Sequence, residues 1–196
     1  MIPASDTSSS LHLPALRSLG ELADAKPIIV VESREQEPLV FTRLQSVKGT
    51  LYSGDYSILG LEDLFAVERK SIDDMVSCCA GSNRERFEHE GVRLRGLRFK
   101  RIIIIGSRAL IELQRYRSRI SPAAVLGTLT AFEVRFDLPI VYCDTPEAAA
   151  LQTERWVFYF CREYVKRVNE LLRGSRSLQE AITETKQQTN QTQHNG

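Results

Sequence analysis

Carboxylates and one lysine follow an apolar run in the segment FAVERKSIDD, residues 65–74. Side chains two residues apart on a strand point to the same face, so Glu68 and Lys70 are expected to share one. Asp55, in the motif SGDYSI, belongs to the preceding strand of a predicted hairpin, and Glu32 ends an earlier apolar strand. We therefore expect three carboxylates and one lysine to converge at the ends of three strands.

Such a group of side chains suits the chemistry of a hard divalent cation. Mg²⁺ binds one or two protein carboxylates, keeps several water molecules and completes its shell with phosphate oxygens. A bound metal can activate water for attack on a phosphodiester, and a nearby lysine can stabilise the charge that develops. The alternative is a surface hairpin held by salt bridges among two acids and two bases, namely Asp55, Glu68, Arg69 and Lys70.

The residues that follow the lysine have a structural explanation of their own. Ser71 fits the N-cap of a short helix, IDDMVSCCA, with Asp74 in the capping-box position. Asp73 then is an exposed acid in the first turn, where the helix dipole favours negative charge.

Positive charge is concentrated in one part of the chain. The 196 residues carry a formal net charge of only +1, yet residues 84–119 hold eleven arginines and lysines against four glutamates, a local net charge of +7. Such an excess is a candidate surface for a polyanion. A solvated, arginine-rich helix face is the alternative explanation of the same pattern.

Other motifs exclude several classes of protein. The four cysteines, Cys78, Cys79, Cys143 and Cys161, have no zinc-site spacing, and we interpret them as reduced, mostly buried thiols. The first ten residues do not resemble a secretory signal, and the longest aliphatic run, IIII, is too short to span a membrane. We expect a soluble intracellular protein, cytoplasmic in a prokaryote or nuclear in a eukaryote. The three histidines match no catalytic pattern.

Short apolar strands alternate with helical patterns along most of the chain. Strands are expected at residues 28–32, 50–58, 64–70, 101–107 and 138–143, and helices at 37–47, 72–80, 84–98, 121–136 and 146–172. This order predicts an α/β/α sandwich around a mixed sheet. We expect a flexible segment at residues 1–26, one domain at 27–173 and a disordered polar tail at 174–196.

Several motifs in the right order resemble the nuclease domain of the XPF family of structure-specific endonucleases. They are GDYSI, then VERKSIDD, then NRERFEHE, and the similarity extends over roughly residues 28–170. That family belongs to the restriction-endonuclease-like superfamily, so the resemblance implies that α/β/α fold. It also favours an active site over the surface salt-bridge hairpin.

The resemblance implies a role for each motif residue. Asp55 and Glu68 would bind Mg²⁺ or Mn²⁺, and Lys70 would be the catalytic lysine. Glu32 would join them as a fourth catalytic residue, although the family usually has Asp at this place. Arg69 and Asp74 would support the site. Three arginines would contact DNA phosphates, namely Arg84, Arg86 and Arg93.

The implied activity is metal-dependent hydrolysis of one strand of branched or flapped DNA, in repair or recombination. Many relatives carry a helix-hairpin-helix module that grips DNA, and no such pattern follows Leu172. Another subunit or the basic surface at residues 84–119 would supply the grip. A homodimer or a heterodimer with a related subunit is implied, through residues 125–136 and 156–160. The alternatives are a non-catalytic DNA-binding or scaffold subunit, and a nuclease for RNA or for a defined DNA site.

Overall fold

The computed structural model describes residues 26–194, and the side chains of 181 and 184–194 are not part of that description. By its contacts the chain divides into two compact units. One unit is Lys26–Cys161, and the other contains the chain from Arg162 onward. The flexible segment predicted at residues 1–26 lies, apart from its last residue, outside the described residues, and the predicted boundary at residue 173 stays a prediction.

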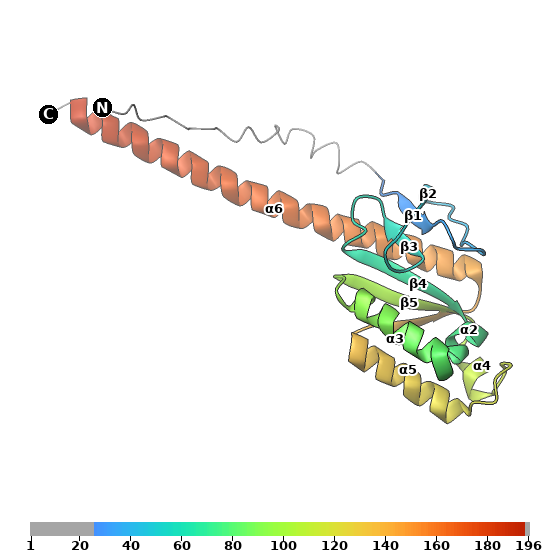
Figure 1. Ribbon diagram of the computed structural model, residues 1–196. Coiled ribbons are helices and arrows are strands. Elements are labelled where there is room, and N and C mark those ends of the chain that lie inside the picture. The colour runs from blue at the N-terminus through green and yellow to red at the C-terminus, as the bar shows by residue number, and fades with distance from the viewer. Residues whose placement is uncertain (1–25, 195–196) are drawn as a thin grey trace, which may run out of the picture. The chain divides into compact units, whose positions relative to one another are not determined.

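A mixed six-stranded sheet forms the centre of the first unit, with the strand order β2-β1-β3-β4-β5-β6 (Figure 1). The pairs β1–β2, β4–β5 and β5–β6 are parallel, whereas β3 runs antiparallel to both β1 and β4. The strands are β1 (Ile29–Glu32), β2 (Ser46–Gly49), β3 (Tyr56–Ile58), β4 (Phe65–Ser71), β5 (Phe99–Ile105) and β6 (Ile140–Cys143). Because β4 and β5 are parallel, their carboxyl ends reach the same edge of the sheet.

Helices cover both faces of the sheet and bury two separate apolar clusters. One cluster lies under α2 (Ile72–Ser77), α3 (Gly81–Arg95), α4 (Arg108–Glu112) and α5 (Pro122–Phe136). The other lies under the first turns of α6 (Pro146–His194). Strand β5 contributes Ile102 and Ile104 to the first cluster and Ile103 to the second, as its continuous apolar sequence predicts. The predicted three-layer α/β/α fold is therefore confirmed.

Local capping signals begin the helices where the sequence predicts. The Ser71 hydroxyl accepts a hydrogen bond from the Asp74 backbone N–H and opens α2 directly at the end of β4. Ser121 caps α5 in the same way, and Pro122 occupies the first turn. The capping residue at the start of α2 thus leaves only one residue between the helix and Lys70.

The helix predicted at residues 37–47 is absent, and that prediction is wrong. The backbone N–H groups of Thr42, Arg43 and Leu44 donate instead to one carboxylate oxygen of Glu154 in α6, at 2.6–3.0 Å. Strand β2 begins soon afterwards and pairs with β1. A buried acceptor on a distant helix has taken the donors that a local helix would use, so tertiary contacts override the apolar spacing.

Helix α6 continues beyond the end predicted near Leu172 and reaches His194. The sequence predicted no regular structure after Gly174, so the structure differs from that expectation. Glutamine, glutamate, leucine and arginine in this stretch all favour helix when exposed, and residues 173–180 are exposed. Within the described residues no helix is long and apolar enough to cross a membrane.

Candidate active site

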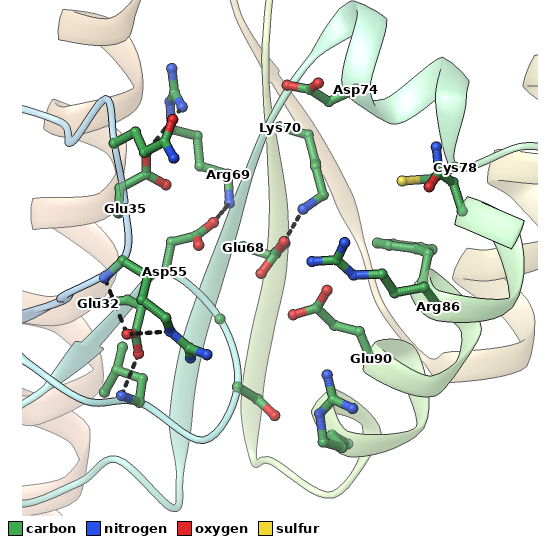
Figure 2. A pocket seen from close by; sticks show the side chains of 18 of the residues that line it. Glu32, Glu35, Asp55, Glu68, Arg69, Lys70, Asp74, Cys78, Arg86 and Glu90 are labelled. Carbon is green, nitrogen blue, oxygen red and sulfur yellow. Dashed lines mark hydrogen bonds and ion pairs between the residues drawn. The ribbon is translucent and has the colours of Figure 1, made fainter.

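A pocket of about 680 Å³ opens at the carboxyl ends of β1 and β4. Its walls are the loop after β1, the segment that leads into β3, the end of β4, and helices α2 and α3 (Figure 2). Of the predicted site residues, all but Arg84 line it: Glu32, Asp55, Glu68, Arg69, Lys70, Asp74, Arg86 and Arg93. The sheet therefore brings together side chains that lie far apart in the chain.

Asp55 is held against β4 by its own backbone and side chain. Its N–H donates to the Val67 carbonyl at 2.9 Å, and its Oδ2 accepts the backbone N–H of Arg69 at 2.7 Å. Gly54 makes this approach possible, because its φ is +79° and a Cβ there would lie 2.9 Å from the Cβ of Ala66. The glycine before the aspartate is thus a steric requirement of the site.

Glu68 and Lys70 point to the same side of β4, as strand alternation predicts. The Lys70 ammonium contacts Glu68 Oε1, so the two side chains form an ion pair. Glu68 is only 3% exposed. The exposed salt-bridge hairpin, which the sequence left as an alternative, does not describe this buried carboxylate.

Glu32 lies at the end of β1 with both carboxylate oxygens in use. Its Oε1 accepts from Arg34 Nε at 2.9 Å and from the Ser33 hydroxyl at 3.0 Å, while Oε2 accepts the backbone N–H of Leu51. Its own N–H donates to the Asp55 carbonyl at 2.9 Å. Glu32 therefore ties the end of β1 to the segment that carries Asp55.

Arg69 leaves β4 on the opposite side from Lys70. Its guanidinium lies 2.9 Å from Glu37 and 3.5 Å from Glu35, and its side chain is 14% exposed. These contacts hold the loop after β1 at the rim of the pocket. The sequence singled out Arg69 but not Glu35 or Glu37, because the pairing joins residues more than thirty positions apart.

One face of α3 lines the pocket with Arg86, Glu90 and Arg93. In Figure 2, Arg86 and Glu90 point toward Glu68 and Lys70 of β4. The spacing of four and three residues places these three side chains on one helix face. Glu90 was not predicted from the sequence, although its spacing of four residues from Arg86 was a signal that could have found it.

Arg84 does not face the pocket with Arg86. Its Nε pairs with Glu88 at 3.1 Å, its guanidinium lies 5.8 Å from the ring centroid of Phe132, and Glu88 also binds Arg135 of α5. The two arginines are two residues apart, and on a helix this spacing turns their side chains to different faces. Arg84 thus contacts α5, where the sequence predicted a position beside Arg86.

A comparison with family models matches the ERCC4 domain over residues 30–155, which is more than half of the chain. The chain belongs to the ERCC4-domain family. This match confirms the XPF-family nuclease domain that the motifs predict. Comparison with curated proteins finds no match.

Solved structures similar to this ERCC4 domain include XPF from Aeropyrum pernix, at 23% identity and a TM-score of 0.55, covering 67% of this chain and 60% of that one. A second is XPF from Aeropyrum pernix in complex with DNA, at 20% identity and a TM-score of 0.54, covering 70% and 66% of the two chains. The chain thus spans about three fifths to two thirds of these relatives' length. At these identities the likeness concerns the fold.

In the pocket of the ERCC4 domain, several carboxylates lie close to Lys70. Burial raises the pKa of Glu68 well above its usual range, and the charge of Asp55 raises it further. Burial also raises the pKa of Asp55 to about 6, with Glu35 and Glu90 adding to the effect. Burial by itself lowers the pKa of Lys70, but the carboxylates of Glu68, Glu90 and Asp55 raise it above the ordinary value.

The donor set of the ERCC4 domain fits a hard divalent cation. Asp55 and Glu68 each have one carboxylate oxygen engaged, by the Arg69 N–H and by Lys70, and no described residue hydrogen-bonds to the other oxygen. Two carboxylates and an open pocket suit Mg²⁺, which keeps several water ligands. Among the side chains that the structure describes, no three histidine, cysteine or acidic groups form a ready-made metal cluster.

Proposed function

We propose that this protein is a divalent-metal-dependent endonuclease that hydrolyses one strand of branched or flapped DNA. The observation that carries the proposal is the convergence of Asp55, Glu68 and Lys70 in an open pocket whose rim bears Arg86 and Arg93. Family membership supports the same reaction class, and an XPF from Aeropyrum pernix has been solved in complex with DNA. Repair or recombination is the setting that we infer.

In this proposal Asp55 and Glu68 would hold the metal, since each has one oxygen that no described residue engages. Bound Mg²⁺ or Mn²⁺ would supply Lewis-acid chemistry at the scissile phosphate and lower the pKa of a bound water. Lys70 stays protonated beside Glu68, where it orients the attacking water and offsets charge on the phosphate oxygens. The oxygen of water bonds to phosphorus and the water gives up a proton to solvent, while the P–O bond to the leaving group breaks and the leaving oxygen takes up a proton from solvent.

Other pocket residues position this machinery in our proposal. Glu32 acts as a positioning residue, because both of its oxygens already hold backbone and side-chain donors around Asp55. Asp74 supports the turn after Lys70 through its hydrogen bond with Ser71 at 2.6 Å. Arg69 holds the rim of the pocket through Glu35 and Glu37.

Arg86 and Arg93 are the proposed phosphate contacts on α3. Both are exposed and line the pocket, so they can meet a backbone that enters it. Such contacts give salt-sensitive affinity with little base specificity. Arg84, which pairs with Glu88, is better suited to supporting α3 against α5.

We also propose a dimer, with a second copy or a related subunit as partner. On α5 the apolar stripe of Val125, Leu129 and Phe132 is buried in the core and unavailable. The exposed apolar side chains in the two predicted surfaces are Val134, which is 81% exposed, and Phe158 and Tyr159 on α6. These residues are the candidate contacts.

The rival function is a non-catalytic DNA-binding or scaffold subunit. Such a protein has no need for a buried acid pair with open oxygens beside a lysine, so the composition of the pocket favours the enzyme. The rival predicts binding of branched DNA without hydrolysis.

Cleavage of labelled fork, flap and plain duplex DNA, with Mg²⁺, Mn²⁺ or EDTA, tests the proposal. We expect metal-dependent cutting of the branched substrates, reduced at least about 100-fold in Lys70→Ala. Cutting by Lys70→Ala at the wild-type rate would refute the site assignment. Tight DNA binding without any cutting would favour the scaffold subunit.

A further inference from the structure

The segment between α4 and α5, residues 113–121, presents three arginines to solvent, and we name it the arginine loop. Arg115, Arg117 and Arg119 are exposed, while the residues between them are half-buried. Tyr116 and Ile120 pack against the apolar cluster under α5. This alternation turns one side of the loop to the core and displays the guanidinium groups on the other.

Hydrogen bonds fix the backbone of the arginine loop. The Arg115 N–H donates to the Leu110 carbonyl at 2.7 Å, and the Tyr116 hydroxyl donates to the Ile120 carbonyl at 2.7 Å. The Ser118 hydroxyl accepts the Ile120 N–H at 3.2 Å. A loop that folding has already ordered loses little further entropy when it binds a ligand.

The arginine loop is anchored next to the pocket. Asp73 of α2 accepts the backbone N–H of Arg117 at 2.8 Å, and the neighbouring residue Asp74 lines the pocket. Figure 1 shows α4 and the loop after it close to α2. Arg86 and Arg93 of α3 line the same pocket as Asp74, so α2 contacts the arginine loop through Asp73 and borders the pocket through Asp74.

The charges of the arginine loop are largely uncompensated. Arg117 is 94% exposed, and its Nε lies 3.5 Å from Asp73, at the long end of the ion-pair range. Within the described chain no carboxylate pairs with Arg115 or Arg119, although Arg108 and Arg84 are each paired on their own helices. Three exposed arginines in five residues, with one weak partner, give this surface a local excess of positive charge, which attracts polyanions.

We propose that the arginine loop is a second phosphate-binding element, which holds the DNA backbone beside the cut site. The inference rests on the proposed function in naming DNA as the polyanion. Together with Arg86 and Arg93, the loop would let the nuclease contact phosphates at the pocket and also beyond it, next to α2. With this arrangement the nuclease domain itself would contribute affinity for the DNA backbone.

Equilibrium binding of fluorescent fork DNA, measured by anisotropy from 50 mM to 300 mM salt, tests the arginine loop. All chains carry Lys70→Ala so that the DNA stays uncut. The test variant is Arg115→Ala with Arg119→Ala, and the control is Arg43→Ala with Arg155→Ala, which removes two exposed arginines that do not line the pocket. A third variant, Arg115→Lys with Arg119→Lys, keeps the charge.

We expect the test variant to bind about tenfold more weakly and to reduce the slope of log K against log salt by about 2, because two phosphate contacts are lost. The dissociation constant of the control variant should stay within about twofold of that of its parent. The lysine variant should keep most of the salt dependence. Equal losses in test and control variants, or no loss in either, would overturn the proposal.

Cleavage by the same variants with Lys70 intact separates this inference from the proposed function. If the chain with Lys70 never cuts but the loop variant still loses affinity, the nuclease assignment fails and the phosphate contact stands. If the chain cuts branched DNA and the loop variant binds like its parent, the nuclease assignment stands and the loop proposal fails.

Discussion

At the scale of single residues, the acidic side chains of the pocket differ in how their oxygens are used. Glu32 accepts hydrogen bonds on both oxygens, and those from Arg34, Leu51 and Ser33 together lower its pKa to about 2 despite burial. Asp55 and Glu68 instead keep one oxygen open, and burial raises the pKa of both. The hydrogen bonds of Glu32 stabilise the fold. The buried carboxylates of Asp55 and Glu68 are unfavourable when charged, and a bound cation would stabilise their charged forms.

Replacing Glu32 by alanine should destabilise the folded protein by about 1–3 kcal/mol, because the buried N–H of Leu51 loses its acceptor. Urea unfolding at pH 7 measures this loss. Arg34→Ala is the control, since its side chain is 79% exposed and should contribute much less. An unchanged unfolding midpoint in Glu32→Ala would contradict the positioning role.

The lowered pKa of Glu32 predicts that the stability of the fold depends on pH. Because the pKa of Glu32 is lower in the folded than in the unfolded chain, its carboxylate stabilises the fold above about pH 4.5. This contribution is lost as the pH falls from about 4.5 toward 2. The stability difference between wild type and Glu32→Gln should therefore shrink between pH 6 and pH 3, and a constant difference would contradict it.

Asp55→Asn should abolish cutting while leaving the fold intact or slightly more stable. The amide oxygen can still accept the Arg69 N–H, and the substitution removes a charge that burial disfavours. Thermal unfolding in EDTA and cleavage in Mg²⁺ measure the two effects, and the loss of rate should be at least about 100-fold. A large drop in melting temperature would show that Asp55 is mainly structural.

At the scale of elements, a carboxylate on α6 determines the path of the chain between β1 and β2. Glu154 is 4% exposed and accepts three successive backbone N–H groups from residues 42–44. This acceptor orders the connection to β2, which then pairs with β1 in parallel. The edge of the sheet therefore depends on a residue more than one hundred positions away.

Glu154→Ala should destabilise the protein by about 3 kcal/mol, since three part-buried backbone donors lose one charged acceptor. Glu154→Gln keeps an acceptor and should cost less. Chemical denaturation measures both, and hydrogen exchange at residues 42–44 should accelerate in the alanine variant. The exposed neighbour Arg155→Ala is the control, and equal losses at both positions would contradict the role of Glu154.

At the scale of the whole molecule, the buried residues of both apolar clusters precede Arg162. That distribution agrees with the compact unit Lys26–Cys161. The side chains of residues 173–180 are exposed. Removal of exposed helical residues takes little apolar burial from the folded state. The nuclease chemistry that we propose also lies within that unit.

A chain that ends at residue 173 should therefore keep its fold and its cleavage of branched DNA. Its melting temperature should fall by less than about 4 °C, the shift that about 1 kcal/mol produces in a domain of this size. Differential scanning calorimetry and the fork-cleavage assay test the two halves of the prediction. If the shortened chain aggregates or no longer cuts DNA, the last 23 residues contribute to the folding or the activity of the protein.

Local sequence patterns were enough to predict the structure of a segment wherever that structure depends on the segment's own side chains. The apolar run into Glu68, the cap at Ser71 and the aliphatic strand β5 were all predictable, because alternation and capping act between near neighbours. The convergence of Asp55, Glu68 and Lys70 followed from strand alternation and a hairpin. The motif resemblance then supplied the family that the domain comparison confirms.

Tertiary structure alone decided the features that depend on partners distant in the chain. It replaced a predicted helix with a loop held by Glu154 and paired the Arg84 side of α3 with α5. Hydrophobic spacing reports which side of an element is buried, but it carries no information about which distant polar group will meet it. A buried donor or charge must find a partner within the folded chain, so such choices are made only when the layers pack.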